Sequence, residues 1–342
     1  MIQPEALLQQ YFGHKAFRTG QKQAIDAILS GRDVLAVMPT GAGKSVCYQI
    51  SALLLPGVTI VISPLISLMK DQVEALRQVG IPAAYINSSI SQEEFYHSMQ
   101  MLQQGQCRIL YVAPERLMTE SLLRLAQRVQ ISMIAVDEAH CVSQWGQDFR
   151  QSYLDIPVFM EQLLVRPVCT AFTATATKQV EADIARILKL RDPETIHTGF
   201  DRKNLFFGVR RPNSKMTELF HLLKENDGKS GIVYCSTRKA VEEVCASLCD
   251  AGFDATRYHA GLSDVERAQN QDDFLYDRKP IMVATNAFGM GIDKSNVSFV
   301  IHYNMPMDLE SYYQEAGRAG RDGEPAQCIL CLLYTSDAAD DR

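Results

Sequence analysis

A glycine-rich stretch at residues 39–45, Pro-Thr-Gly-Ala-Gly-Lys-Ser, has the composition of a phosphate-binding loop. Glycines such as Gly41 and Gly43 let the backbone curl until its amides point at phosphate oxygens, and a helix starting there adds a favourable dipole. Lys44 would reach the β- and γ-phosphates, and the Ser45 hydroxyl would ligate Mg²⁺. The first glycine of the usual pattern is absent, yet the Gly-Lys-Ser ending after an apolar run favours nucleoside triphosphate binding over an ordinary turn.

Two carboxylates, Asp137 and Glu138, directly follow a short apolar run. A carboxylate at the end of a buried strand can complete the magnesium shell opposite Ser45, and the next one can polarise the attacking water. We therefore assign Asp137 to Mg²⁺ and Glu138 to the general-base or water-positioning role. A solvated acidic turn is the alternative, but beside a phosphate loop the pair indicates hydrolysis. Nothing marks a kinase acceptor site, and the Asn-Lys-x-Asp signature of guanine sites does not occur.

Residues 314–323, near the far end of the sequence, are dense in charge and glycine. Arg318 and Arg321 are three residues apart, so on a helix they would share a face. An arginine that reaches the γ-phosphate from another part of a protein raises turnover by roughly a thousandfold or more. Alone, such a stretch is more often a surface loop. Because a phosphate loop is present, we predict that both arginines complete the nucleotide site.

Short β-branched apolar runs alternate with amphipathic stretches, and this alternation predicts the elements that hold these residues. In the first half, strands are predicted at residues 34–38, 58–63, 108–112, 133–136 and 169–173, with helices at 64–79 and 91–104. The pattern then restarts, with strands at residues 231–235, 255–259, 281–284, 297–302 and 328–332 and a helix at 238–250. Strands that alternate with helices predict mostly parallel sheets covered on both faces.

The 342 residues fit two domains. Residues 191–202 lie between the two runs of predicted strands and are interpreted as the linker, which places the boundary near residue 199. We predict an α/β fold with a first domain over residues 1–199, a second over 200–333, and an ATP cleft between them. Residues 334–342 are small, acidic and poor in apolar side chains, which favours a non-native or disordered tail.

Composition narrows the classes of protein further. The 46% hydrophobic and 22% charged residues are ordinary for a soluble globular protein. No apolar stretch approaches the roughly 18–20 residues that span a membrane, and the N-terminus lacks a secretory layout. The nine scattered cysteines fit reduced cytosolic thiols, and Cys328 and Cys331 favour a buried strand over a zinc site. The net charge of −6 counts only weakly against nucleic-acid binding, which needs local positive charge.

From Gln21 to Arg321, the motifs resemble in order those of superfamily 2 helicases, and their form is most similar to the RecQ family. Residues 8–21 resemble the RecQ adenine-recognition motif. In that motif the glutamine, here Gln21, reads the adenine edge, while the arginine, here Arg18, supports the nucleotide. From the residues alone, Gln21 would be an ordinary position on an amphipathic helix.

Residues 143–150 resemble the aromatic-rich loop that in RecQ proteins couples single-strand binding to ATP hydrolysis. Trp145 and Phe149 offer stacking faces worth ~1–3 kcal/mol per base, and Arg150 offers charge or a cation–π contact. The alternative is that Trp145, the only tryptophan, anchors a core. Because polar Gln144 and a glycine flank it, we favour the nucleic-acid role.

The resemblance implies two RecA-like domains, ATP and Mg²⁺ as cofactors, and 3′-to-5′ movement along DNA in repair and recombination. It implies single-stranded and partly duplex DNA as partners, with single-strand-binding and repair proteins besides, no membrane, and a location in the bacterial cytoplasm at the nucleoid. Zinc is expected only in a four-cysteine module that follows the core in intact relatives. An RNA-directed superfamily 2 motor and a fragment that binds nucleotide or DNA without unwinding are the alternatives.

The implied site residues fall into two groups. The nucleotide and catalytic group comprises Phe17, Arg18, Gln21, Thr40, Gly41, Gly43, Lys44, Ser45, Asp137, Glu138, Gln314, Arg318 and Arg321. The nucleic-acid-binding group comprises Ser63, Lys70, Arg116, Gln144, Trp145, Phe149, Arg150, Ser236, Arg238, His259 and Thr285.

Overall fold

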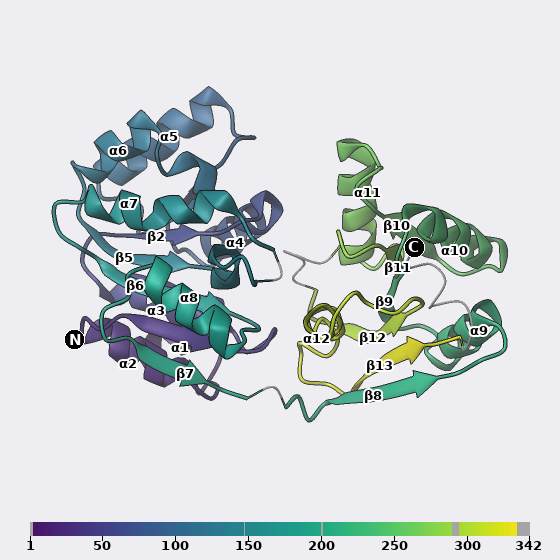
Figure 1. The fold of residues 1–342 in the computed structure, drawn as a ribbon. Coiled ribbons are helices and arrows are strands. Elements are labelled where there is room, and N and C mark those ends of the chain that lie inside the picture. The colour runs from purple at the N-terminus through teal and green to yellow at the C-terminus, as the bar shows by residue number, and fades with distance from the viewer. Residues whose placement is uncertain (1–2, 147, 200, 289–293, 334–342) are drawn as a thin grey trace. The chain divides into compact units, whose positions relative to one another are not determined.

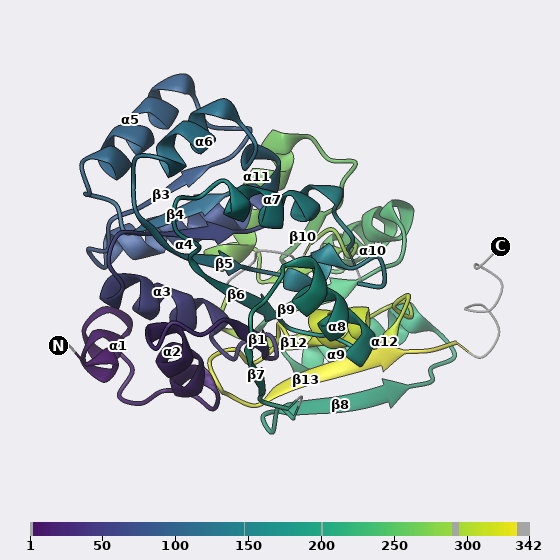
Figure 2. The same cartoon turned by 60° about the vertical axis from the view of Figure 1, so that its left-hand side comes forward.

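The computed structural model describes residues 3–146, 148–199, 201–288 and 294–333. The chain divides into two compact units, residues 1–200 and 201–342, and each is built on a parallel sheet of its own (Figures 1 and 2). The expected tail at 334–342 and a glycine-rich part of the helicase resemblance at 289–293 lie outside the described residues.

The first unit contains a seven-stranded sheet of order β3-β4-β2-β5-β6-β1-β7, in which every neighbouring pair is parallel. Its strands are β1 (Val34–Val37), β2 (Val58–Ile62), β3 (Ala83–Ile86), β4 (Ile109–Val112), β5 (Ile131–Val136), β6 (Val168–Thr173) and β7 (Glu194–His197). The interior strands are buried nearly throughout, as continuous apolar runs in a parallel sheet should be.

Helices cover both faces of this sheet because side chains alternate along each strand. On β5, Met133 and Ala135 join one core with α1 (Pro4–Phe12), α2 (Gln21–Leu29), α3 (Lys44–Leu54) and α4 (Ile66–Gln78). Ile134 and Val136 join the opposite core with α5 (Gln92–Gln103), α6 (Glu120–Ala126), α7 (Asp155–Glu161) and α8 (Lys178–Ile187). Three short 3-10 helices, η1 (Pro114–Arg116), η2 (Ala139–Val142) and η3 (Gln151–Leu154), lie between these elements.

The second unit contains a six-stranded parallel sheet of order β10-β11-β9-β12-β13-β8. Its strands are β8 (Leu205–Arg210), β9 (Ser230–Tyr234), β10 (Ala255–Tyr258), β11 (Ile281–Ala284), β12 (Val297–His302) and β13 (Ala326–Cys331). One core contains α9 (Lys215–Glu225) and α10 (Arg238–Asp250), and the other contains α11 (Asp264–Leu275) and α12 (Leu309–Ala316). The predicted α/β fold with two parallel sheets is confirmed.

Three strands were not predicted, namely β3, β7 and β8. β7 lies inside the stretch interpreted as the linker, which is therefore partly wrong, because Glu194–His197 pairs with β1 along the sheet edge. Only Ile196 of this strand is buried, so no apolar run marks it. Cys328 and Cys331 lie fully buried on β13, as predicted. Among the described residues, no cluster of metal ligands occurs and no helix has the length and apolarity to cross a membrane.

A buried ion pair joins three segments of the first unit. Asp33, 2% exposed at the start of β1, accepts two hydrogen bonds from the Arg166 guanidinium, at 3.0 and 2.6 Å. The same carboxylate accepts from the backbone amides of Cys169 on β6 and of Arg191 just before β7, at 2.9 and 2.7 Å. One side chain therefore ties β1 to the strands on both sides of it.

We predict that Asp33→Ala lowers the free energy of unfolding by about 3–5 kcal/mol, because it leaves a partly buried guanidinium without its counter-charge. Asp26→Ala is the matched control, since Asp26 pairs with Lys22 on the exposed face of α2 and such a pair contributes about 1 kcal/mol or less. Urea unfolding measures both variants, and equal losses would contradict the role given to Asp33.

Candidate functional site

Three of the predicted motifs of the first unit follow the carboxyl ends of parallel strands. The phosphate loop follows β1, the acidic pair follows β5, and Ser63 follows β2. In a parallel sheet these ends meet at one edge, which is where ligands bind in open α/β folds. Since β6 alone separates β1 from β5, the fold brings Lys44, Ser45 and Asp137 to neighbouring positions of this edge.

The phosphate loop has the backbone conformation that glycine allows. Gly41 and Gly43 have φ angles of 82° and 77°, and Gly43 is the N-cap of α3. The first amides of α3 therefore follow a tight turn, which is the arrangement that binds phosphate. Lys44 and Ser45 occupy the first positions of the helix, and the Lys44 ammonium donates to the carbonyl of Met38 at 3.2 Å.

Gln21 binds the phosphate loop directly. Its amide nitrogen donates to the carbonyls of Ala42 and Gly43, at 3.0 and 3.1 Å, and its amide oxygen accepts from the backbone of Arg18 at 2.8 Å. The Arg18 guanidinium in turn donates to the carbonyl of Gly41. A Cβ atom on Gly43 would lie 2.5 Å from the Gln21 nitrogen. The residues expected to recognise adenine thus contact the loop expected to hold the phosphates.

The other predicted nucleotide contacts lie beside this cluster. Phe17 packs, half-buried, against the core that contains α2 and α3. Thr40 lies half-buried in the phosphate loop itself.

Asp137 and Glu138 differ in their surroundings although they are adjacent. Asp137 is 6% exposed and its backbone is fixed by Ile62 and by the Tyr153 hydroxyl, at 2.9 Å each. Burial, reinforced by the charge of Glu138 and opposed by Lys44, raises the pKa of Asp137 above its usual range. A carboxylate whose charged form is penalised by burial gains from a nearby cation.

Glu138 has a φ of 46°, in the left-handed region that costs a non-glycine residue roughly 1–2 kcal/mol. Backbone strain of this kind gathers at functional sites. One carboxylate oxygen is buried 3.4 Å from Nδ1 of His140, and that nitrogen lies 2.9 Å from the Thr173 hydroxyl. Because the hydroxyl donates to the Thr175 carbonyl, it accepts from His140, so Nδ1 carries the proton. Sequence reasoning gave His140 no role.

The aromatic segment (residues 143–150) places its large side chains at the surface. Trp145 is 75% exposed and Phe149 38%, so the core-anchor alternative for Trp145 is wrong. Gln144 is exposed as well. Arg150 is held inside the unit, with its guanidinium on Asp148 and on the carbonyl of Pro64, both at 2.9 Å. It therefore connects this segment to the one that follows β2.

The remaining predicted nucleic-acid contacts of the first unit differ in exposure. The Lys70 side chain is 60% exposed and faces Glu74 at 3.9 Å. Arg116 is half-buried, with its guanidinium over the ring of Phe95. Ser63 is fully buried.

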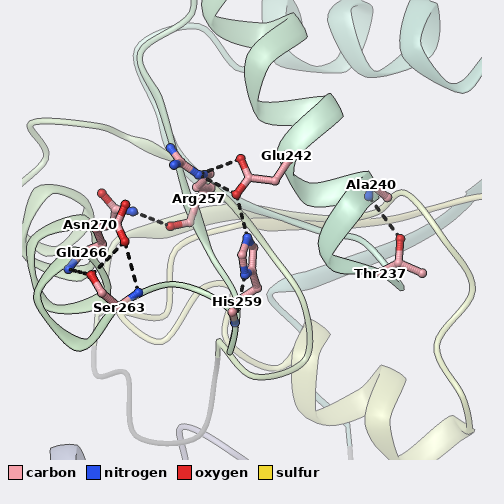
Figure 3. A network of polar contacts seen from close by, with 9 residues as sticks. Thr237, Ala240, Glu242, Arg257, His259, Ser263, Glu266 and Asn270 are labelled. Atoms are coloured by element: carbon pink, nitrogen blue, oxygen red, sulfur yellow. Dashed lines mark hydrogen bonds and ion pairs between the residues drawn. The ribbon is translucent and has the colours of Figure 1, made fainter.

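In the second unit, Ser236 and Arg238 are exposed, whereas Thr285 and His259 are buried. Figure 3 shows why His259 is fixed: its Nδ1 accepts from the Gly261 amide at 3.1 Å, so Nε2 donates to Glu242 at 2.8 Å. Burial alone would raise the pKa of Glu242, but hydrogen bonds from His259 and Arg257 hold it below the usual range. Both ring nitrogens of His259 are thus engaged within the unit.

The two arginines of the second unit lie in turns that follow α12, so the expectation that they share a helix face is wrong. Gln314 precedes them within the helix. The carbonyls of this turn accept hydrogen bonds from the guanidinium of Arg202, to Gly317, Ala319 and Gly320.

The amide of Asn204 donates to Gly320 as well, at 2.8 Å. The sequence did not reveal Arg202 and Asn204, because side chains that bind backbone carbonyls 118 and 116 residues away carry no local pattern. Arg202 and Asn204 set the shape of the turn that carries Arg318 and Arg321.

We predict that Gly43→Ala weakens nucleotide binding about tenfold or more, because the new methyl group would push Gln21 off the loop at a cost above the ~1.4 kcal/mol that corresponds to tenfold. Gly31→Ala is the control: it has a similar φ of 83° with open space around the added atom. Titration with a fluorescent ATP analogue measures both variants. Equal affinity for Gly43→Ala and the wild type would show that the contact is unimportant.

Comparison with known proteins agrees with this arrangement. The family model "DEAD/DEAH box helicase" matches residues 18–183, and "Helicase conserved C-terminal domain" matches residues 214–323. Among solved structures, yeast Dbp5 bound to RNA and ADP BeF3 aligns with a TM-score of 0.78 at 19% identity, over 99% of this chain and 89% of its own. Mss116p bound to single-stranded RNA and AMP-PNP aligns at 0.79 and 18% identity, over 98% and 73%. These two likenesses concern the fold.

Two relatives of higher sequence identity carry the same name, ATP-dependent DNA helicase RecQ. The chain is 49% identical over 327 residues to the ATP-dependent DNA helicase RecQ of Bacillus subtilis, covering 95% of this chain and 55% of that protein. For the Haemophilus influenzae protein of the same name, identity is 46%, over 95% and 52%. The chain thus spans about half the length of these relatives. The order of its motifs, its two parallel sheets and these identities agree, and the chain belongs to the RecQ family of helicases.

Proposed function

We propose that this chain is the ATP-driven motor of a RecQ-type DNA helicase, which couples ATP hydrolysis to 3′-to-5′ movement along single-stranded DNA. The observation that supports the proposal lies at the carboxyl edge of the first sheet, where Gln21 binds the phosphate loop after β1 and the strained Glu138 follows β5. The names of the relatives at 46–49% identity favour DNA over RNA as the track. The cell process would be DNA repair and recombination, in the cytoplasm at the nucleoid.

The residues of the first unit fit ATP with Mg²⁺. Ser45 stands in the first turn of α3, and Asp137 is a buried carboxylate one strand away from the phosphate loop. A hydroxyl and a carboxylate at these positions are the ligands that phosphate-loop enzymes give to Mg²⁺, which would neutralise charge on the phosphates. Lys44 would bind the phosphates, and Glu138 would orient the attacking water with His140 beside it.

Arg318 and Arg321 would act on a nucleotide held by the other unit. Both follow α12 in the turn shaped by Arg202 and Asn204, so their backbone is fixed before any ligand arrives. We propose that ATP draws these arginines toward its γ-phosphate and that hydrolysis releases them. Gln314 on α12 would support the same contact. Movement then requires only that ATP and ADP differ in affinity for the closed arrangement of the two units.

Single-stranded DNA would pass over the exposed groups of both units. Trp145 and Phe149 offer stacking faces in the first, and Ser236 and Arg238 offer polar contacts in the second. Buried Ser63, His259 and Thr285 would act through backbone groups or by shaping their loops. Partly duplex DNA, and single-strand-binding or repair proteins, are further partners that the relatives suggest. An RNA-directed motor is the rival, and replacing DNA by RNA as the stimulator distinguishes the two.

Two substitutions test the proposed site. Lys44→Ala should lose ATP binding, whereas Arg321→Ala should keep ATP binding and lose turnover by about a thousandfold, the effect of removing a γ-phosphate arginine. Arg210→Ala is the control, since Arg210 lies half-exposed on β8 beside Glu218. Steady-state phosphate release with single-stranded DNA measures all three. Full stimulation by DNA in both Lys44→Ala and Arg321→Ala would overturn the assignment.

A further inference from the structure

The aromatic segment begins at a buried hydrogen bond to a different helix. Ser143 is fully buried; its hydroxyl donates to Oδ2 of Asp183 on α8 at 2.8 Å and accepts from the Trp145 amide at 3.1 Å. Trp145 itself is 75% exposed, two residues later. The segment therefore carries its exposed ring on a base that is fastened inside the unit.

Asp183 is built to hold this contact. It is 6% exposed, and its second oxygen accepts from the guanidinium of Arg186 at 2.7 Å. The hydrogen bonds from Arg186 and Ser143 lower the pKa of Asp183. The partner Arg186 is 71% exposed, and an exposed pair on one helix contributes little. The surface ion pair with Arg186 therefore accounts for only one oxygen of the carboxylate. The other oxygen, Oδ2, accepts the buried hydrogen bond from Ser143.

Between the aromatic segment and α8 lies a pocket of about 360 Å³. The segment lines it with Trp145 and Phe149, and α8 lines it with Gln179, Asp183 and Arg186. A group bound there would contact both elements at once. Such a group would therefore act on the hydrogen bond between Ser143 and Asp183, which we call the Ser143–Asp183 joint.

Ser143 is also close in the chain to the predicted catalytic carboxylate, Glu138. The short helix η2, Ala139–Val142, is the only chain between Glu138 and Ser143. His140, in the middle of η2, is tied to Thr173 at the end of β6 by a 2.9 Å hydrogen bond. α8 follows the same strand and packs against η2. A shift of Ser143 would therefore reach Glu138 through the four residues of η2.

We propose that Asp183 is a positioning residue that sets the aromatic segment relative to Glu138, so that a nucleobase entering the pocket is sensed at the catalytic carboxylate. The proposal rests on the proposed function, since the base belongs to the single strand on which the motor would move. Asp183 lines the pocket that the nucleobase would enter but contacts neither ATP nor the catalytic water in this scheme. It acts through Ser143.

Four variants test the hydrogen bond between Ser143 and Asp183 separately from the contacts around it. Ser143→Ala removes the hydroxyl that bonds Asp183 and the Trp145 amide, whereas Asp183→Ala removes the bonds to Ser143 and Arg186 and leaves the Trp145 contact. Asp183→Asn keeps an oxygen for Ser143, and Arg186→Ala removes only the surface partner. Trp145 is the only tryptophan, so steady-state anisotropy of its fluorescence reports on the segment in the protein without nucleic acid. Anisotropy should fall in Ser143→Ala and Asp183→Ala and stay at the wild-type value in the other two. Thermal melting confirms that each variant is folded.

The second readout is the concentration of oligo-dT that gives half-maximal ATPase stimulation. It should rise about tenfold in Ser143→Ala and Asp183→Ala, as loss of a hydrogen bond to a charged group would produce, and rise less in Asp183→Asn, which keeps a neutral acceptor for Ser143. If Asp183→Ala does not fold, the comparison of Ser143→Ala with Asp183→Asn decides.

The two readouts fail separately. If the Trp145 anisotropy of Ser143→Ala equals that of the wild type, the Ser143–Asp183 hydrogen bond does not position the aromatic segment, and the proposal is wrong. Lower anisotropy with an unchanged oligo-dT requirement would overturn its link to catalysis. Absence of any DNA stimulation in the wild type would overturn the proposed function, and with it the sensing role, while the anisotropy still decides whether the joint exists.

Discussion

Everything in the proposed site depends on both sheets being wholly parallel. A parallel strand must be followed by a connection that returns to the starting edge, so every residue that comes directly after a strand lies at the same edge. Ser63 and Asp137 directly follow β2 and β5, Thr173 ends β6, and Lys44 follows the loop after β1. All four therefore lie toward one edge of the first sheet, although 129 positions separate Lys44 from Thr173 in the sequence. Chemistry that needs a lysine, a hydroxyl and a carboxylate together is thereby brought about by topology.

Close contacts then convert this placement into a defined geometry. Gly43 lets Gln21 approach the phosphate loop, the Thr173 hydroxyl fixes the tautomer of His140, and Arg202 fixes the turn that carries Arg318. Each contact joins elements that are remote in sequence. Each also uses a backbone group or a buried polar atom, which is expensive to leave unsatisfied. The structure therefore holds the reactive groups through neighbours that come from distant parts of the sequence.

The sequence alone predicted the elements with strong signals. Continuous apolar runs identified β1, β2 and β5, and the phosphate loop and acidic pair were placed from residue types at their ends. Strands with a weak apolar pattern were not predicted, since β7 buries only Ile196 and β8 exposes Phe206. Their pairing is decided by neighbouring strands rather than by local propensity. The three-residue spacing of Arg318 and Arg321 also gave a wrong prediction, because α12 ends at Ala316, before either arginine.

If this chain is a DNA-driven motor, it hydrolyses ATP in response to single-stranded DNA. Steady-state phosphate release by the purified 342-residue chain tests it most directly, with oligo-dT, with an RNA oligomer of the same length, and with neither. We expect strong stimulation by DNA and weak stimulation by RNA. Binding of ATP without any DNA-dependent release, or a rate as high with RNA as with DNA, would contradict it.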